Sequence, residues 1–160
     1  MASLSVHLPP LPLEGGCQCG RVRYRITGAP LVFYLCHCSE CQRHTSSAFG
    51  ESLRVRRTDI EVEGELRLTE RLADSGTRRE GYFCPVCGVR IIHASAGAER
   101  VNLKAGTLDD TSWLVPAGHI WTRSKQRFIA IGPDELAYET QPDDGDAALL
   151  ARWNEMLAPA

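Results

Sequence analysis

Seven cysteines in three short groups are the residues of this chain whose types and spacing most clearly allow chemistry. They form a C-x-C pair (Cys17, Cys19), a C-x-C-x-x-C group (Cys36, Cys38, Cys41) and a C-x-x-C pair (Cys84, Cys87). In an extended segment, residues i and i+2 point to the same face, so a C-x-C pair can place both sulfurs on one ion. A C-x-x-C pair needs a turn. Gly20 and Gly88 follow the flanking pairs directly and allow tight turns there, so the spacing is typical of zinc knuckles.

The alternative for these cysteines is a disulfide framework, and the sequence speaks against it. Seven cysteines cannot all pair within one chain, and a bond between Cys84 and Cys87 would restrain very little backbone. Residues 1–13 lack a basic segment followed by an apolar one, and no apolar run approaches the roughly 20 residues needed to cross a bilayer. We therefore expect a cytoplasmic protein with no membrane partner, in which closely spaced cysteines are reduced and available to metal.

Zinc chemistry divides the seven sulfurs into four and three. A structural zinc takes four protein ligands, whereas a catalytic zinc keeps one position open for water or substrate. The compact middle group can reach a single ion, which leaves the two flanking pairs to close a second site across a long loop. We predict structural zinc on Cys17, Cys19, Cys84 and Cys87, and catalytic zinc on Cys36, Cys38 and Cys41. The spacing does not decide whether both sites are filled.

The identity of an eighth ligand decides what the middle site can do. With three protein ligands the ion could bind a thiol as thiolate, polarise a carbonyl oxygen or lower the pKa of water. A histidine would instead close the site: His44 has C-x-x-C-x-x-H spacing, while His37, His93 and His119 are less constrained. An anionic substrate would need cations near such a thiolate-rich centre, for which the candidates are Arg21, Arg43, Arg78 and Arg79. Ser47, Arg43 and His119 are candidates to orient a substrate.

The elements that must position these residues are mostly short strands in one domain, for which 160 residues suffice. Alternating apolar and polar residues predict strands at 21–27, 31–35, 52–55, 60–63, 66–69, 81–84, 89–93, 101–105 and 127–131, with a hairpin turn at Gly64-Glu65. Apolar residues at helical spacing predict a helix over 147–157, capped by the acidic residues before it. We expect a flexible leader (1–14), a zinc domain (15–140) and a helical tail (141–160). A net charge of -2 without a long basic run predicts no nucleic-acid partner.

Four segments in this order resemble one family: GGCQCGRVRYRI, CHCSECQRHTSSAFG, YFCPVCGVRI and LKAGTLDD. The pattern is similar to that of the glutathione-dependent formaldehyde-activating enzymes, also called the centromere protein V/Gfa domain, over residues 15–131. The resemblance implies a mainly β, Mss4-like fold with a zinc-held β-sheet, to which the sequence adds a short C-terminal helix. It also implies structural zinc on the first and last cysteine pairs and catalytic zinc on the middle group. The segment His119-Ile120-Trp121 with Ser124-Lys125 resembles a family stretch that commonly has Ser-Arg followed by an aromatic residue. Lys125 and Phe128 depart from that pattern, and lysine cannot form arginine's two-pronged contact with a carboxylate.

The activity that the resemblance implies is carbon-sulfur bond formation between glutathione and formaldehyde, which gives S-hydroxymethylglutathione and is classed as a lyase reaction. The expected partners are therefore a small thiol and a small aldehyde. Two alternatives remain open: a non-catalytic binding module in which both zinc ions are structural, and a lyase or hydrolase that acts on a different thiol adduct. The sequence predicts neither the oligomeric state nor the side chains that would bind glutathione.

Overall fold

The computed structural model describes residues 5–73 and 75–157, which divide into two compact units. Unit 1 combines the chain up to Leu8 with Leu31–Ser52 and the part from Trp113 onward. Unit 2 combines Pro9–Pro30 with Leu53–Ser112. Each unit holds one of the two cysteine groupings predicted from the sequence, so the units are described in turn.

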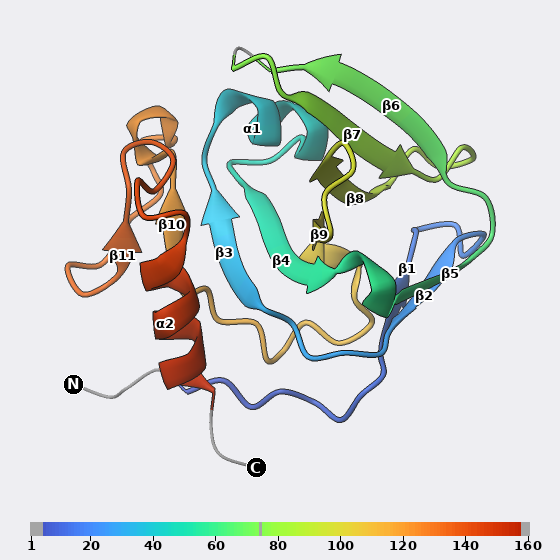
Figure 1. The fold of residues 1–160 in the computed structure, drawn as a ribbon, viewed down its shortest axis with the longest axis horizontal. Coiled ribbons are helices and arrows are strands. Elements are labelled where there is room, and N and C mark those ends of the chain that lie inside the picture. The colour runs from blue at the N-terminus through green and yellow to red at the C-terminus, as the bar shows by residue number, and fades with distance from the viewer. Residues whose placement is uncertain (1–4, 74, 158–160) are drawn as a thin grey trace. The chain divides into compact units, whose positions relative to one another are not determined.

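Unit 1 has a parallel strand arrangement beside two helices (Figure 1). Strand β10 (Gly118–Ile120) lies between β3 (Val32–Cys36) and β11 (Leu136–Ala137), and the start of β4 (Gly50–Arg56) follows β3 in the strand order. The register places Ile120 opposite Cys36. Helix α1 (Ser39–Thr45) and the 3-10 turn η3 (Thr122–Ser124) follow the ends of β3 and β10. The apolar strand β3 thus leads the chain from the buried interior directly into the middle cysteine group.

The C-terminal helix α2 (Ala147–Met156) confirms the predicted helix at 147–157. Its first turn is capped by Asp144, whose carboxylate accepts hydrogen bonds from the N–H groups of Asp146 and Ala148. Leu149, Trp153 and Met156 form its buried face. Val6, in the segment predicted as a leader, is 1% exposed and donates its N–H to the Met156 carbonyl. That part of the segment packs within unit 1, while the domain limits at residues 15 and 140 stay predictions.

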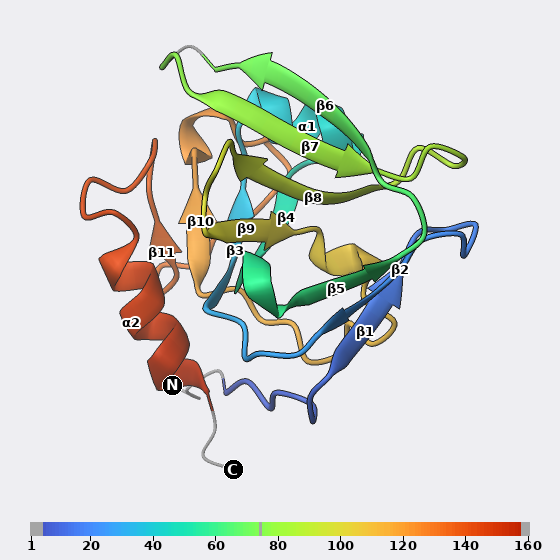
Figure 2. The same ribbon diagram turned by 45° about the vertical axis from the view of Figure 1, so that its right-hand side comes forward.

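Unit 2 contains a three-stranded antiparallel sheet and a longer antiparallel arrangement (Figure 2). In the first, β2 (Arg23–Ile26) lies between β1 (Leu13–Gly16) and β5 (Ile60–Glu63). In the second, the rest of β4 is followed by β9 (Arg100–Leu103), β8 (Arg90–Ser95), β7 (Arg78–Phe83) and β6 (Arg67–Leu72). The 3-10 turns η1 (Arg57–Asp59) and η2 (Ala105–Thr107) complete the unit. The protein is therefore mainly β, as predicted.

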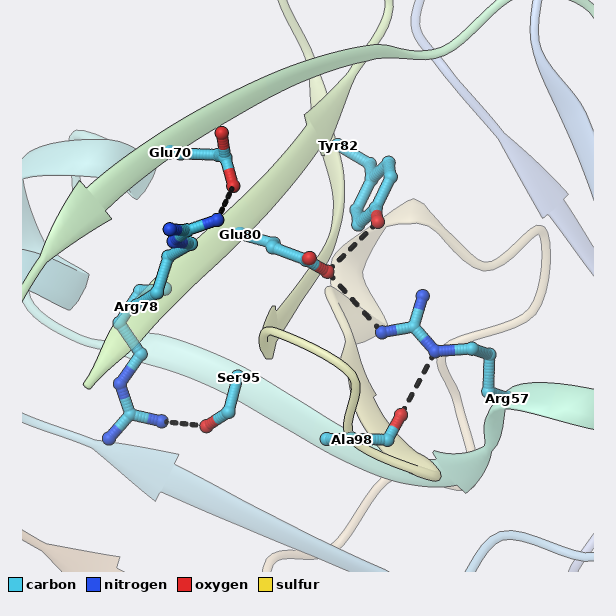
Figure 3. Close-up of polar contacts among 8 residues, drawn as sticks. Arg57, Glu70, Arg78, Glu80, Tyr82, Ser95 and Ala98 are labelled. Carbon is cyan, nitrogen blue, oxygen red and sulfur yellow. Dashed lines mark hydrogen bonds and ion pairs between the residues drawn. The ribbon is translucent and has the colours of Figure 1, made fainter.

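A polar network ties η1 to the sheet of unit 2 (Figure 3). The Arg57 guanidinium donates to the Ala98 carbonyl at 2.9 Å and contacts the Glu80 carboxylate at 3.4 Å. The same carboxylate accepts a hydrogen bond from the Tyr82 hydroxyl at 2.9 Å. Glu80, on β7, is the less exposed partner of the ion pair, and the Arg57 guanidinium compensates its negative charge.

Two details of the predicted strands are wrong. Strands β5 and β6 do not form a hairpin at Gly64: β5 pairs with β2, and β6 pairs with β7, because Gly64, at φ 91°, turns the chain out of the first sheet. The segment 127–131 is not a strand. The Ile129 N–H bonds to the Gln126 carbonyl in a turn, and Phe128 is 75% exposed. Its alternating pattern has no neighbouring strand to pair with among the described residues.

Within residues 5–73 and 75–157, no helix combines the length and apolar character needed to cross a membrane.

We expect Trp153→Ala to destabilise the protein by about 3–5 kcal/mol, because this side chain is 0% exposed and its removal leaves a large cavity. The exposed neighbour Asn154 provides the matched control, since Asn154→Ala should change stability by no more than about 0.5 kcal/mol. Urea unfolding followed by circular dichroism measures both. Equal midpoints for the two variants would contradict the packing described for α2.

Candidate functional site

The first and last cysteine pairs meet in unit 2 and form what we call the four-cysteine cluster, Cys17, Cys19, Cys84 and Cys87. All four sulfurs lie within 4.8 Å of one another. The Cys17 and Cys19 sulfurs are 3.5 Å apart, and those of Cys19 and Cys84 are 3.8 Å apart. Tetrahedral zinc with Zn–S bonds of about 2.3 Å requires sulfurs about 3.8 Å apart. The cluster therefore fits one four-coordinate metal ion.

Two tight turns present these sulfurs. Gly20 (φ 75°) donates its N–H to the Cys17 carbonyl, and Gly88 (φ 77°) donates to the Cys84 carbonyl, so each turn ends on a glycine in the left-handed region. The Val22 N–H points at the Cys17 sulfur at 3.2 Å. This hydrogen bond and those from the neighbouring thiols outweigh burial and lower the pKa of Cys17 to about 6. The predicted knuckle geometry is thus present at both pairs.

The middle group forms a second cluster in unit 1, the three-cysteine cluster, Cys36, Cys38 and Cys41, whose sulfurs also lie within 4.8 Å of one another. Cys36 ends β3, and Cys38 is the N-cap of α1. The Cys38 sulfur accepts a hydrogen bond from the Cys41 N–H at 3.3 Å. One turn of helix therefore brings the third sulfur back to the first two, and the group can hold one ion.

No histidine, aspartate or glutamate among the described residues of unit 1 joins the three sulfurs at that distance. The suggestion that His44 closes the site through its C-x-x-C-x-x-H spacing is therefore not realised, although this residue lies on α1. His37 and His119 also stay outside the group; they contact each other instead. Disulfides do not form either, because all seven cysteines are free thiols. The three-cysteine cluster thus offers a metal ion three ligands from unit 1.

Sulfur crowding controls the charge of the three-cysteine cluster. Hydrogen bonds from the Cys36 and Cys41 thiols lower the pKa of Cys38 to about 2, despite the burial that opposes this shift. The neighbouring thiolate correspondingly raises the pKa of Cys36 far above its usual range. The cluster therefore holds one thiolate readily, but it can hold three only when a cation neutralises them.

A polar cavity of about 600 Å³ lies in unit 1 along α1. Its lining consists of Ser39, Gln42, Arg43, Ser46, Ser47, Ala48 and Gln126. Ser39 and Gln42 directly follow Cys38 and Cys41 in the chain, so the cavity adjoins the helix that contains Cys41 and has Cys38 as its N-cap. Arg43 is its charged lining residue. Two of the candidates for orienting a substrate, Arg43 and Ser47, thus line a cavity of ligand size.

The other candidate cations have different surroundings. In unit 2, Arg78 contacts Glu70 at 3.6 Å (Figure 3). Arg79 donates to the Ser95 hydroxyl. Arg21 is exposed and lies two residues after Cys19 in the chain. Only Arg43 of the four lines the cavity of unit 1.

Sequence reasoning missed a network of amides that connects α1 to the chain after β10. Gln42 donates to the carbonyl of His37 at 2.8 Å and to that of Ser124 at 2.9 Å. Gln126 in turn donates to the Gln42 side chain at 3.0 Å, and the Ser124 hydroxyl donates to the His37 carbonyl at 3.0 Å. Residues more than 80 positions apart meet here, and no local pattern in the sequence indicates it.

We expect Cys84→Ser to lower both zinc content, from two ions per chain to one, and stability, by several kcal/mol, because binding to a structural site contributes directly to folding. Cys38→Ser serves as the matched control: it should lose the other ion with a smaller loss of stability, since Cys38 lies within one local segment whereas Cys84 binds across 65 residues. Metal analysis and thermal unfolding measure both effects. A larger loss of stability for Cys38→Ser would contradict these roles.

Three comparisons with known proteins were made. The sequence profile of the family described as "Glutathione-dependent formaldehyde-activating enzyme" matches residues 12–124. A search of curated proteins found no match. Among solved structures, a Rhodobacter sphaeroides protein matches at 20% sequence identity and a TM-score of 0.49, over 79% of this chain and 99% of that one. The family profile covers more than half of the sequence, so the chain belongs to the family of glutathione-dependent formaldehyde-activating enzymes.

Proposed function

We propose that this protein is a zinc-dependent carbon-sulfur lyase that joins a thiol such as glutathione to formaldehyde or a related small aldehyde. The observation that supports this most is the three-cysteine cluster, which groups three sulfurs without a fourth ligand from the described residues of unit 1. Three protein ligands are the number found in catalytic zinc sites, whereas structural sites have four. Family membership supports the same class of reaction.

The two clusters take different roles in this proposal. The four-cysteine cluster holds a structural zinc ion, and the three-cysteine cluster holds a catalytic one. Zinc bound there would supply a Lewis acid that favours the thiolate form of a substrate or polarises an aldehyde oxygen. In the addition, the thiol sulfur bonds to the aldehyde carbon, the carbonyl double bond becomes single, and the thiol proton ends on that oxygen.

The cavity beside α1 suits the larger of the two substrates. Its volume of about 600 Å³ falls within the range of about 300–1,000 Å³ found for small-molecule sites. The lining offers hydroxyl and amide groups for the peptide bonds of glutathione, and Arg43 offers a guanidinium for a carboxylate. Formaldehyde needs no pocket of this size. Arg43 is thus proposed to bind the thiol substrate, and proximity supplies much of the rate enhancement.

Exchange of ¹³C-formaldehyde into S-hydroxymethylglutathione, followed by NMR, tests the proposal, because this method separates catalysis from the spontaneous reaction. The zinc-loaded protein should accelerate exchange, and Cys38→Ser should lower the rate by at least about 100-fold by removing a metal ligand. A zinc-loaded protein with both sites filled that accelerates exchange for no thiol and aldehyde would refute the proposal and favour a zinc-held binding module.

We expect Arg43→Ala to raise the KM for glutathione about tenfold with little change in kcat, because a charge-assisted hydrogen bond to the substrate contributes about 1.4 kcal/mol or more. The KM for 2-mercaptoethanol, a thiol without a carboxylate, should stay the same. Arg67→Ala, at an exposed arginine on β6, is the control and should alter neither KM. Equal KM changes for the two thiols would show that Arg43 does not bind the glutathione carboxylate.

A further inference from the structure

His37 occupies the middle of the C-x-C sequence in the three-cysteine cluster, and its side chain is buried at 0% exposure. Consecutive side chains of an extended segment point to opposite faces, so this ring lies away from the sulfurs on either side of it. It packs edge-on against Phe49, with ring centroids 5.5 Å apart, and stacks with His119 at 5.2 Å. The ring is thus enclosed by aromatic neighbours on the side opposite the cluster.

The main chain of His37 is also held at both ends. Its N–H donates to the Ile120 carbonyl at 2.9 Å. Its carbonyl accepts two hydrogen bonds, from the Gln42 amide and the Ser124 hydroxyl. Since Cys36 and Cys38 are its direct neighbours, these hydrogen bonds hold the backbone from which both of their side chains project.

The side chain extends this anchoring through a line of three titratable groups. The His37 Nε2 and His119 Nδ1 atoms are 2.9 Å apart, and His119 Nε2 lies 3.5 Å from the Glu135 carboxylate. A carboxylate only accepts, so the His119 proton belongs on Nε2 and its Nδ1 accepts in turn. The His37 proton must then lie on Nε2, which leaves Nδ1 bare. Indeed His37 Nδ1 has no hydrogen-bond partner among the described residues.

The donors in this line point the same way. The His37 Nε2 atom faces His119 Nδ1, and the His119 Nε2 atom faces the Glu135 carboxylate. Because the carboxylate at the end of the line only accepts, it favours the proton of each ring on the nitrogen that faces Glu135.

We propose that Glu135 and His119 are positioning residues that hold His37 in its Nε2–H tautomer and thereby fix the Cys36 and Cys38 sulfurs in place for a metal ion. The inference rests on the proposed metal site but not on any catalytic activity. Loss of this support widens the distribution of sulfur positions, so the three-cysteine cluster binds metal more weakly. The four-cysteine cluster has its own turns and keeps its affinity.

Three variants test the proposal in the full-length protein. His119→Leu fills the buried position with an apolar side chain and removes the acceptor for His37 Nε2–H. His119→Asn is the matched control, because its amide oxygen can occupy the place of Nδ1 and accept the same hydrogen bond. Glu135→Gln keeps the shape of the side chain, which is 38% exposed. The glutamine amide can donate as well as accept, so it no longer determines the tautomers of His119 and His37.

Long-range ¹H–¹⁵N NMR of the metal-free and zinc-loaded protein reads the tautomer directly. The wild type should show His37 protonated on Nε2 and bare on Nδ1, and Glu135→Gln should show a mixture of the two tautomers. A wild-type His37 that carries its proton on Nδ1 would overturn the proposal, as would unchanged tautomer signals in Glu135→Gln. This readout is independent of turnover, so it can fail or succeed separately from the proposed enzyme activity.

Competition with a chelator measures the second consequence. His119→Leu should weaken zinc binding at the three-cysteine cluster by about 10–100-fold, the effect typical of lost outer contacts around metal ligands, and leave the affinity of the four-cysteine cluster unchanged. His119→Asn should bind zinc with an affinity within about threefold of the wild type, a much smaller loss than that of His119→Leu. Equal affinities for wild type and His119→Leu would overturn the positioning role. If His119→Leu does not fold, the tautomer measured in Glu135→Gln decides the question.

Discussion

Closely packed thiolates repel one another, and this repulsion limits the negative charge that each cysteine cluster can carry without a metal ion. In both cysteine clusters the sulfurs lie within 4.8 Å of one another, so all of them can be charged only around a cation. The four-cysteine cluster meets this constraint across 65 residues of chain, between Cys19 and Cys84. An ion bound there would link the segment before β2 to the segment after β7, and its binding would contribute to the stability of unit 2.

The same constraint has a different consequence in the three-cysteine cluster, because the described part of unit 1 supplies no fourth ligand. None of the described histidines of unit 1 joins the three sulfurs. The His37 ring contacts His119 instead. In the two proposals, His37 therefore supports the cluster without binding the ion, and the neighbouring cavity along α1 would supply the polar surface for a substrate.

Local chemistry made much of this predictable. The division of the cysteines followed from their spacing, because C-x-C and C-x-x-C geometry depends only on nearby backbone. Likewise, the helix at 147–157 followed from apolar periodicity and the acidic residues that precede it. Long-range pairing was not predictable in the same way. Alternation marked β5 and β6 as strands but did not reveal that they pair with β2 and β7, and it marked 127–131 as a strand where no partner exists among the described residues.

The site shows the same limit at the level of single residues. His44 has ligand spacing, but its place on α1 leaves it outside the sulfur group. Glu135 belongs to no sequence motif. It lies directly before β11, and the pairing of β11 with β10 brings its carboxylate close to His119. Parallel pairing of β10 with β3 then places His119 next to the strand that ends in the cluster. Such roles depend on the register of distant strands, which the spacing of residues along the chain does not encode.

X-ray absorption at the zinc edge of protein that holds two zinc ions per chain shows whether the zinc ion of the three-cysteine cluster has an open position. Because the clusters contribute four and three sulfurs, we expect seven sulfurs and one lighter atom shared between the two ions. On addition of glutathione, the lighter atom should be replaced by an eighth sulfur. Imidazole nitrogen among the ligands, in a spectrum that glutathione leaves unchanged, would show instead that the protein encloses both ions and would refute the open position.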